Sequence, residues 1–269
     1  RTVRLPGKVG GTFGVRESTR NLRRLLRKPG TKLRFATVTY ANARWKLTVN
    51  LETGPLHRGR HVPADLEQPI VGIDRGLRCF AVVADEHGRE LARIDPPRPL
   101  RARLRRLRRL SRALSRKAKG SRGRIRARRQ LGRLHGHIRN IRHHALRELV
   151  SWLAKTHGHL VVETLSTRAL MGTWLARSLA DVGWALFELW LTTKVAWHGG
   201  TLTKAPPHFP STQQCSQCQH RGPKVPLHQR TFRCGHCGFV ADRDTNAAIN
   251  LARYARSHSS ASPGSLGRP

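Results

Sequence analysis

Four of the five cysteines stand in two identically spaced pairs in the last third of the sequence. Cys215 and Cys218 belong to "CSQC", Cys234 and Cys237 belong to "CGHC", and 15 residues separate the pairs. Each pair places two thiolates on a tight turn, and two such turns at the ends of a hairpin close a tetrahedral four-cysteine zinc site. Disulfides and free thiols are the alternatives, and the lack of a secretory signal beside the cysteines favours zinc. With four protein ligands, this zinc has no open position for water and is expected to be structural.

Three carboxylates occupy positions where they could act together. Asp74 ends the apolar run "PIVGI", Glu163 ends "HLVV", and Asp244 opens "TNAAINLARYA", where we expect it to cap a helix. Taken singly, a cap, a turn or an exposed strand end explains each of them. If the two strands lie side by side and the last helix packs at the edge of their sheet, the three acids converge. Converging carboxylates need cations, and hard oxygen ligands suit Mg²⁺ or Mn²⁺.

Two such ions bound side by side by these acids would activate a water and stabilise the leaving 3′ oxygen in phosphodiester hydrolysis.

Apolar patterning predicts the elements that position these residues. Alternation over 36–52 predicts a β-hairpin, followed by a linker rich in Gly and Pro over 53–69. "PIVGI", "CFAVVAD" and "ELARI" predict a meander of three strands, with Cys79 buried in the second, and "HLVVE" predicts a fourth strand. Residues 175–197 have helical spacing, with Trp184, Phe187, Leu191 and Val195 in the core. The tail from Ser257 is expected to be disordered.

The region of about 100–150 predicts two helices folded into a hairpin with an apolar seam and basic outer faces. The whole chain has 52 Lys and Arg against 15 Asp and Glu, a formal net charge of +37. Such a balance indicates a polyanionic partner, with nucleic acid ahead of an anionic membrane surface or ribosomal RNA. The residues expected to contact nucleic acid are Arg105, Arg108, Arg109, Arg112, Arg116, Lys117, Lys119, Arg124 and Arg128.

The most apolar stretch, 179–197, is interrupted by Asp181, Glu188 and Lys194, so we expect no membrane partner and a cytoplasmic protein. The chain begins at Arg1, which suggests that an N-terminal part of the gene product is missing.

Several stretches together resemble the TnpB family, the transposon-encoded OrfB-type proteins related to type V CRISPR effectors. They are "GIDRGLRCFAVVAD", "HLVVETLSTRALMG", the arginine-rich hairpin, and the cysteine pairs followed directly by "DRDTNAA". The resemblance covers about residues 70–255. It implies an α/β fold with a RuvC-like, RNase H-type nuclease domain, and RNA-guided, Mg-dependent cleavage of DNA. Asp74, Glu163 and Asp244 match the family's three catalytic acids, and Asp242 is then expected only to support the turn out of the zinc ribbon.

The implied domains are a partial β-domain and linker (1–69), a nuclease domain (70–205), an inserted zinc ribbon (206–240), the last acidic motif and helix (241–256), and the tail (257–269). The partners implied are DNA and a guide RNA, while the oligomeric state is left open. A different class of function, a non-catalytic remnant or regulator that binds nucleic acid through the basic hairpin and the ribbon, is the alternative.

Overall fold

The computed structural model describes residues 2–5, 11–54, 69–166, 170–226 and 228–258. Its centre is a five-stranded mixed sheet in the order β7-β6-β5-β8-β9. The strands are β5 (Val71–Arg75), β6 (Ala81–Asp85), β7 (Glu90–Ile94), β8 (His159–Glu163) and β9 (Thr201–Ala205). The first three form an antiparallel meander, and β8 and β9 continue the sheet parallel to β5.

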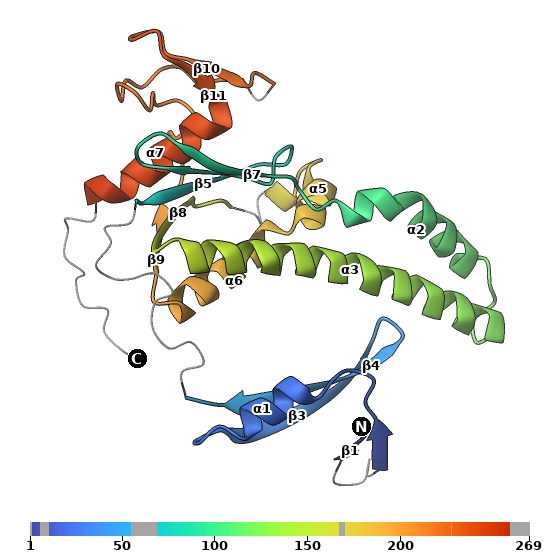
Figure 1. The fold of residues 1–269 in the computed structure, drawn as a ribbon. Helices are drawn as coiled ribbons and strands as arrows, with labels where there is room; N and C mark the ends of the chain where they lie inside the picture. The colour runs from blue at the N-terminus through green and yellow to red at the C-terminus, as the bar shows by residue number, and fades with distance from the viewer. Residues whose placement is uncertain (1, 6–10, 55–68, 167–169, 227, 259–269) are drawn as a thin grey trace.

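Helices cover both faces of this sheet (Figure 1). One face carries α7 (Arg243–His258), which lies across β5, β6 and β8. The other face carries α3 (Arg122–Thr156), α5 (Ala176–Val182) and α6 (Trp184–Trp197). The larger core lies on this second side, where Ile73, Leu153 and Phe187 are fully buried.

Helix α2 (Pro99–Ser115) packs against α3, and both helices extend beyond the sheet (Figure 1). Ser121 begins α3 by accepting a hydrogen bond from the N–H of Arg124 at 3.1 Å. Asp181 accepts the N–H groups of Leu100 and Arg101, both at 2.9 Å, and thereby satisfies the first turn of α2.

The N-terminal part is composed of small elements: β1 (Thr2–Leu5), β2 (Gly11–Gly14), α1 (Arg20–Leu26), β3 (Lys32–Ala41) and β4 (Arg44–Glu52). The predicted hairpin over 36–52 is present as β3 and β4, whose turn at Asn42 and Ala43 has positive φ at both residues. Near the other end of the chain, β10 (Thr231–Arg233) pairs with β11 (Val240–Asp242). Most of the predicted linker and tail lies outside the described residues.

Several details of the predicted elements are wrong. Residues 175–197 form two helices and not one, because Gly183 adopts φ 77° between α5 and α6. Cys79 is half-buried in the turn before β6, outside the strand in which it was expected. Helix α7 continues to His258, past the expected start of disorder at Ser257. Strand β9 was not predicted at all.

Candidate functional site

Asp74 and Glu163 lie next to each other at the carboxyl ends of two neighbouring parallel strands. The register of β5 and β8 pairs Gly72 with Val161 and Ile73 with Val162, and Asp74 and Glu163 are the next residues along the two strands. Side chains alternate along a strand, which places both acids on the face of Gly72 and Val161. Helix α7 covers that face, because Val161 packs against Leu251 of α7.

Asp244 lies in the first turn of α7, near enough for its charge to act on Asp74. Burial raises the pKa of Asp74 well above its ordinary value, and the nearby charges of Glu163 and Asp244 raise it further. Burial also raises the pKa of Glu163, against the opposing charge of Arg75. The structure therefore brings the three acids close enough for their charges to interact. The last helix was expected to pack at the edge of the sheet, but α7 lies across its face.

Two arginines hold the carboxylate of Asp244. The guanidinium of Arg243 donates to Oδ1 of Asp244 from Nε at 3.1 Å and from Nη2 at 2.9 Å. Arg230 donates to Oδ2 at 3.5 Å. Arg243 is fixed in turn, because its Nη1 donates to the carbonyls of Pro226 and Gln229 at 3.3 and 3.2 Å. The loop before β10 thus reaches the third acid through a buried guanidinium.

The helix cap is Asp242, and the expectation that Asp244 caps α7 is wrong. Oδ1 of Asp242 accepts the N–H groups of Asp244 and Thr245 at 3.0 and 3.1 Å. Burial alone would raise the pKa of Asp242, but the hydrogen bonds from Thr245 and Arg93 outweigh it and lower that pKa. Asp244 therefore takes no part in capping, and its carboxylate faces Arg243 and Arg230 instead.

Arg75 leaves β5 on the face opposite Asp74, and it holds the backbone of Glu163. Its guanidinium donates to the carbonyl of Glu163 at 2.6 Å and to Oε2 of Glu188 at 2.9 Å. Lys204 donates to the other oxygen of Glu188 at 2.6 Å. Sequence reasoning missed this side chain, although its position directly after Asp74 and its charge inside a buried strand were a signal.

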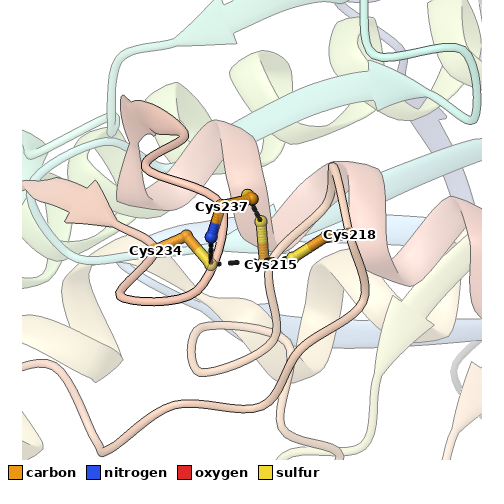
Figure 2. Close-up of side chains that lie close together, drawn as sticks. All are labelled: Cys215, Cys218, Cys234 and Cys237. Carbon is orange, nitrogen blue, oxygen red and sulfur yellow. Dashed lines mark hydrogen bonds between the residues drawn. The ribbon is translucent and has the colours of Figure 1, made fainter.

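The four paired cysteines come together in one cluster (Figure 2). All four sulfur atoms lie within 4.8 Å of one another, with Cys215 and Cys237 at 3.7 Å and Cys218 and Cys234 at 3.6 Å. The N–H of Cys237 points at the sulfur of Cys234 at 3.5 Å, and backbone donation of this kind lowers the pKa of Cys234 to about 6. Burial raises the pKa of Cys215 in the opposite direction, so the case for a metal rests on the geometry of the four sulfur atoms. This cluster could hold zinc.

Among the residues that the structure describes, this is the one group of three or more ligands gathered closely enough for a single ion. Asp74, Glu163 and Asp244 are neighbours but do not reach that mutual separation.

Two buried asparagines fasten the cysteine-bearing segment to α7, and neither was singled out from the sequence. Oδ1 of Asn246 accepts the N–H of Ser216 at 2.9 Å, and its amide nitrogen donates to the carbonyl of Gln214 at 2.8 Å. The amide nitrogen of Asn250 donates to Ser211 and Gln214 at 2.9 and 2.6 Å. Their spacing of four residues, one turn of helix, was the signal available in "TNAAIN".

The predicted nucleic-acid contacts divide into two groups. Most are exposed, and four of them line one groove of about 360 Å³ along α2: Arg105, Arg109, Arg112 and Arg116. Arg108, Lys117, Lys119 and Arg128 are exposed elsewhere on the two helices and their turn. Arg124 instead donates to the carbonyls of Leu114 and Lys117 at 3.1 and 2.9 Å, so it holds the turn between the helices.

No helix among the described residues is long and apolar enough to span a membrane.

Comparison with solved structures defines the class of fold. The chain matches "Cryo-EM structure of CRISPR-Cas12f Ternary Complex" with a TM-score of 0.54 and 19% identity, over 77% of this chain and 42% of that one. A second match, "Cryo-EM structure of the Cas12f1-sgRNA-target DNA complex", has a TM-score of 0.52 and 19% identity, over 80% and 55% of the two chains. The protein therefore has a mixed α/β fold that resembles Cas12f.

Sequence comparison then gives the family. Residues 55–173 match a family described as "Probable transposase", and residues 184–251 match "Cas12f1-like, TNB domain". A "Putative RNA-guided DNA endonuclease" of Mycobacterium tuberculosis is 36% identical over 253 residues, 91% of this chain and 54% of the relative. "Putative RNA-guided DNA endonuclease InsQ" of Escherichia coli is 29% identical, over 80% of this chain and 55% of the relative. The chain is thus a TnpB-like protein, and the resemblance seen in its sequence is confirmed.

This chain spans about half the length of the curated relatives that it matches.

Proposed function

We propose that this protein is a metal-dependent DNA endonuclease guided by RNA, with Asp74, Glu163 and Asp244 as its catalytic acids. The observation that carries the proposal is the pairing of β5 with β8, which sets Asp74 and Glu163 side by side under the first turn of α7. The high pKa of Asp74 supports a cation there, because three acids gathered in a buried place are stable as anions only when a cation compensates them. The names of the relatives support the substrate and the guide.

The donor set fits Mg²⁺ or Mn²⁺, since the three acids offer only hard oxygen ligands. When bound, such ions supply an activated water and charge stabilisation at the leaving oxygen. The chain's own part is to hold the acids. Arg75 fixes the backbone at Glu163, Asp242 fixes the start of α7, and Asp244 leaves its arginine partners to become a ligand.

We also propose that the fold is a RuvC-type nuclease domain over 70–205 and 241–256, completed by a zinc ribbon over 206–240. The sheet order, with Asp74 and Glu163 near the ends of the neighbouring strands β5 and β8, supports this division. The four clustered thiols support a structural Zn²⁺ held by Cys215, Cys218, Cys234 and Cys237. Residues 1–69 would be the partial β-domain.

The guide and target backbones would contact the basic side chains of α2, α3 and their turn. Arg105, Arg109, Arg112 and Arg116 support this assignment, because they line one groove and form no ion pair with a described residue.

The test is cleavage of DNA by the purified protein, co-expressed with the RNA of its own 3′ flank, in Mg²⁺. Asp74→Asn and Glu163→Gln should each lower the rate by at least 10²-fold and leave nucleic-acid binding intact. The matched control is Asp95→Asn, an exposed acid beyond β7, which should cleave like the parent. Cleavage that persists in EDTA, or in either of the two acid variants, would contradict the proposed site.

A second function is favoured by the clamp on Asp244, whose two oxygens face Arg243 and Arg230. An acid held by two arginines cannot bind a cation until they release it, which suits a protein that binds nucleic acid without cutting it. Tight binding with no cleavage by the parent in Mg²⁺ or Mn²⁺ would support this alternative.

A further inference from the structure

A cavity of about 350 Å³ lies between the start of α2, helix α5 and the turn that follows β5. Its apolar wall includes Leu77, Leu104 and Val182, and its charged wall includes Arg98, Arg101 and Arg177. This volume is at the small end of the range of about 300–1,000 Å³ that small-molecule pockets span. The combination of an apolar wall and a cationic one fits a ligand that has one apolar flat part and one anionic part.

The walls of this cavity are held by hydrogen bonds. Arg98 donates to the carbonyls of Leu77 and Arg78 at 2.8 and 3.0 Å, which ties the start of α2 to the turn after β5. Asp181 is 4% exposed, and both of its oxygens accept N–H groups of the first turn of α2. Arg142 donates to the carbonyl of Asp181 at 2.7 Å. The one acid of the cavity is therefore occupied by the backbone, and the charge that faces a ligand is positive.

Two of the arginines remain available. Arg101 and Arg177 are exposed, and neither forms an ion pair with any residue that the structure describes. Arg101 also belongs to a longer row on α2, because Arg105, Arg109, Arg112 and Arg116 continue it at intervals of three or four residues. From Arg101 to Arg116 the row rises over 15 residue-to-residue steps, about 22 Å, which is about six nucleotides at the rise of a B-form strand.

The cavity also lies close to the acids along the chain. Leu77 belongs to its wall and follows Asp74 by three residues, in the turn at the acid end of β5. A strand whose phosphates follow the arginine row would thus meet this cavity before it reaches the acids. Both features suit one ligand, a nucleotide whose base leaves the stack.

We propose that this cavity holds a single unstacked nucleotide of a nucleic-acid strand, with its base on Leu77, Leu104 and Val182 and its phosphate on Arg101 and Arg177. This inference rests on the proposed function, because it names where the strand lies on its way to the acids. The cavity selects single strands, since a paired base cannot enter it without leaving its partner.

The test is equilibrium binding in EDTA, where no cleavage occurs, to fluorescent 20-nucleotide strands of two kinds. One is oligothymidylate, and the other is a sugar-phosphate strand without bases. Ser178→Trp, which fills the cavity from the exposed face of α5, should weaken binding of oligothymidylate about five- to tenfold and leave the abasic strand unchanged. Arg101→Gln with Arg177→Gln should weaken both strands.

The matched control is Arg106→Gln with Arg126→Gln, which removes the same charge from exposed positions outside the cavity. Oligothymidylate binding by Ser178→Trp equal to that of the parent would overturn the inference, and so would equal losses in the two arginine pairs. Competition by AMP at the concentration of the strand would show a free-nucleotide site and would also overturn it. A protein that never cleaves but shows the expected pattern would lose the proposed activity and keep this site.

Discussion

Asp74 carries a carboxylate in a place that the fold has largely removed from water. It is 8% exposed, and burial and its two acidic neighbours raise its pKa well above the ordinary 3.8. The folded state therefore binds this proton more tightly than the unfolded state does. The resulting stability is complete below about pH 4 and is lost as pH rises through the raised pKa. At neutral pH without metal, Asp74 therefore makes the fold less stable than it is near pH 4.

Asp74→Asn should accordingly raise the thermal stability of the metal-free protein at pH 7.5. The melting temperature should rise by about 2–4 °C for each kcal/mol gained, and the difference from the parent should vanish near pH 4. Mg²⁺ should stabilise the parent and not the variant. The measurement is a melting curve in EDTA and in Mg²⁺ at both pH values, with Asp95→Asn as the control. A variant less stable than the parent at pH 7.5 would contradict the raised pKa.

Sequence reasoning reached the acids but not the residues that hold them. Asp74, Glu163 and Asp244 stand at the ends of recognisable apolar or helical stretches, so their positions follow from local pattern. The contact of Arg75 with the carbonyl of Glu163 joins residues 88 positions apart. The guanidinium that bonds Asp244, that of Arg243, is oriented by carbonyls of a loop with no regular structure. Only tertiary structure fixes contacts of that kind.

At the scale of elements, the close approach of α7 to β5 decides where Asp244 lies. A Cβ built on Gly72 would collide with the carbonyl oxygen of Ala248 and would lie 2.6 Å from the nitrogen of Ala252. Both are backbone atoms of α7, so no side-chain movement relieves the clash. Glycine at this position allows the helix to lie on the sheet.

Gly72→Ala should therefore push α7 away from β5 and lower the free energy of unfolding by about 1–3 kcal/mol. Cleavage, if present, should fall more than binding, because Asp244 moves with the helix. Gly14→Ala is the control, since a Cβ there meets nothing within 4 Å and the change should stay within about 0.5 kcal/mol. Urea unfolding of the two variants measures both values, and equal effects would refute the tight packing of α7.

The buried asparagines of α7 join this helix to the segment that carries the cysteines. Asn246 is fully buried, and its amide satisfies one N–H and one carbonyl of the segment that carries Cys215 and Cys218. Asn246→Ala should leave the buried N–H of Ser216 without its partner, while the carbonyl of Gln214 keeps its hydrogen bond from Asn250, and should cost about 1–3 kcal/mol. Zinc uptake should persist, because all four thiols remain.

Calorimetry on the zinc-loaded protein is the measurement, and it should show the cysteine-bearing segment and the sheet unfolding separately in Asn246→Ala. Asn140→Ala, the same change at an exposed position of α3, is the control and should retain one transition. A single transition at the parental temperature in both variants would show that Asn246 does not join the two parts.

The elements missed from the sequence have physical reasons for being missed. Strand β9 reads "TLTKA", a short stretch with a lysine at its fourth position, and it is stable only because it pairs with β8 at the edge of the sheet. The helical spacing of apolar residues continues through Gly183, so it does not show that this residue has positive φ and separates two helices. The strands β5, β6 and β8 were predictable because they are buried on both faces and read as unbroken apolar runs.

At the scale of the whole molecule, charge governs binding. The net charge of +37 is spread over a surface with few acids, and several of those acids are engaged in ion pairs such as Glu90 with Arg93. Every described part of the chain therefore attracts a polyanion to some degree, and the number of phosphates held by any one surface shows only in the salt dependence. Along α2, the guanidinium groups of four arginines line one groove.

Replacing four arginines of this row by glutamine, Arg105, Arg109, Arg112 and Arg116, should therefore change the slope and not only the affinity. For a single strand, each phosphate contact contributes about 0.7 to the slope of log K against log salt, so the slope should fall by about 3. The control removes the same charge from four exposed arginines around α1, Arg16, Arg20, Arg24 and Arg27. Binding of a 20-nucleotide strand from 50 to 300 mM NaCl measures both. If the two quartets lower the slope equally, the strand follows the overall field of the protein; a loss confined to the α2 quartet places its backbone on that helix.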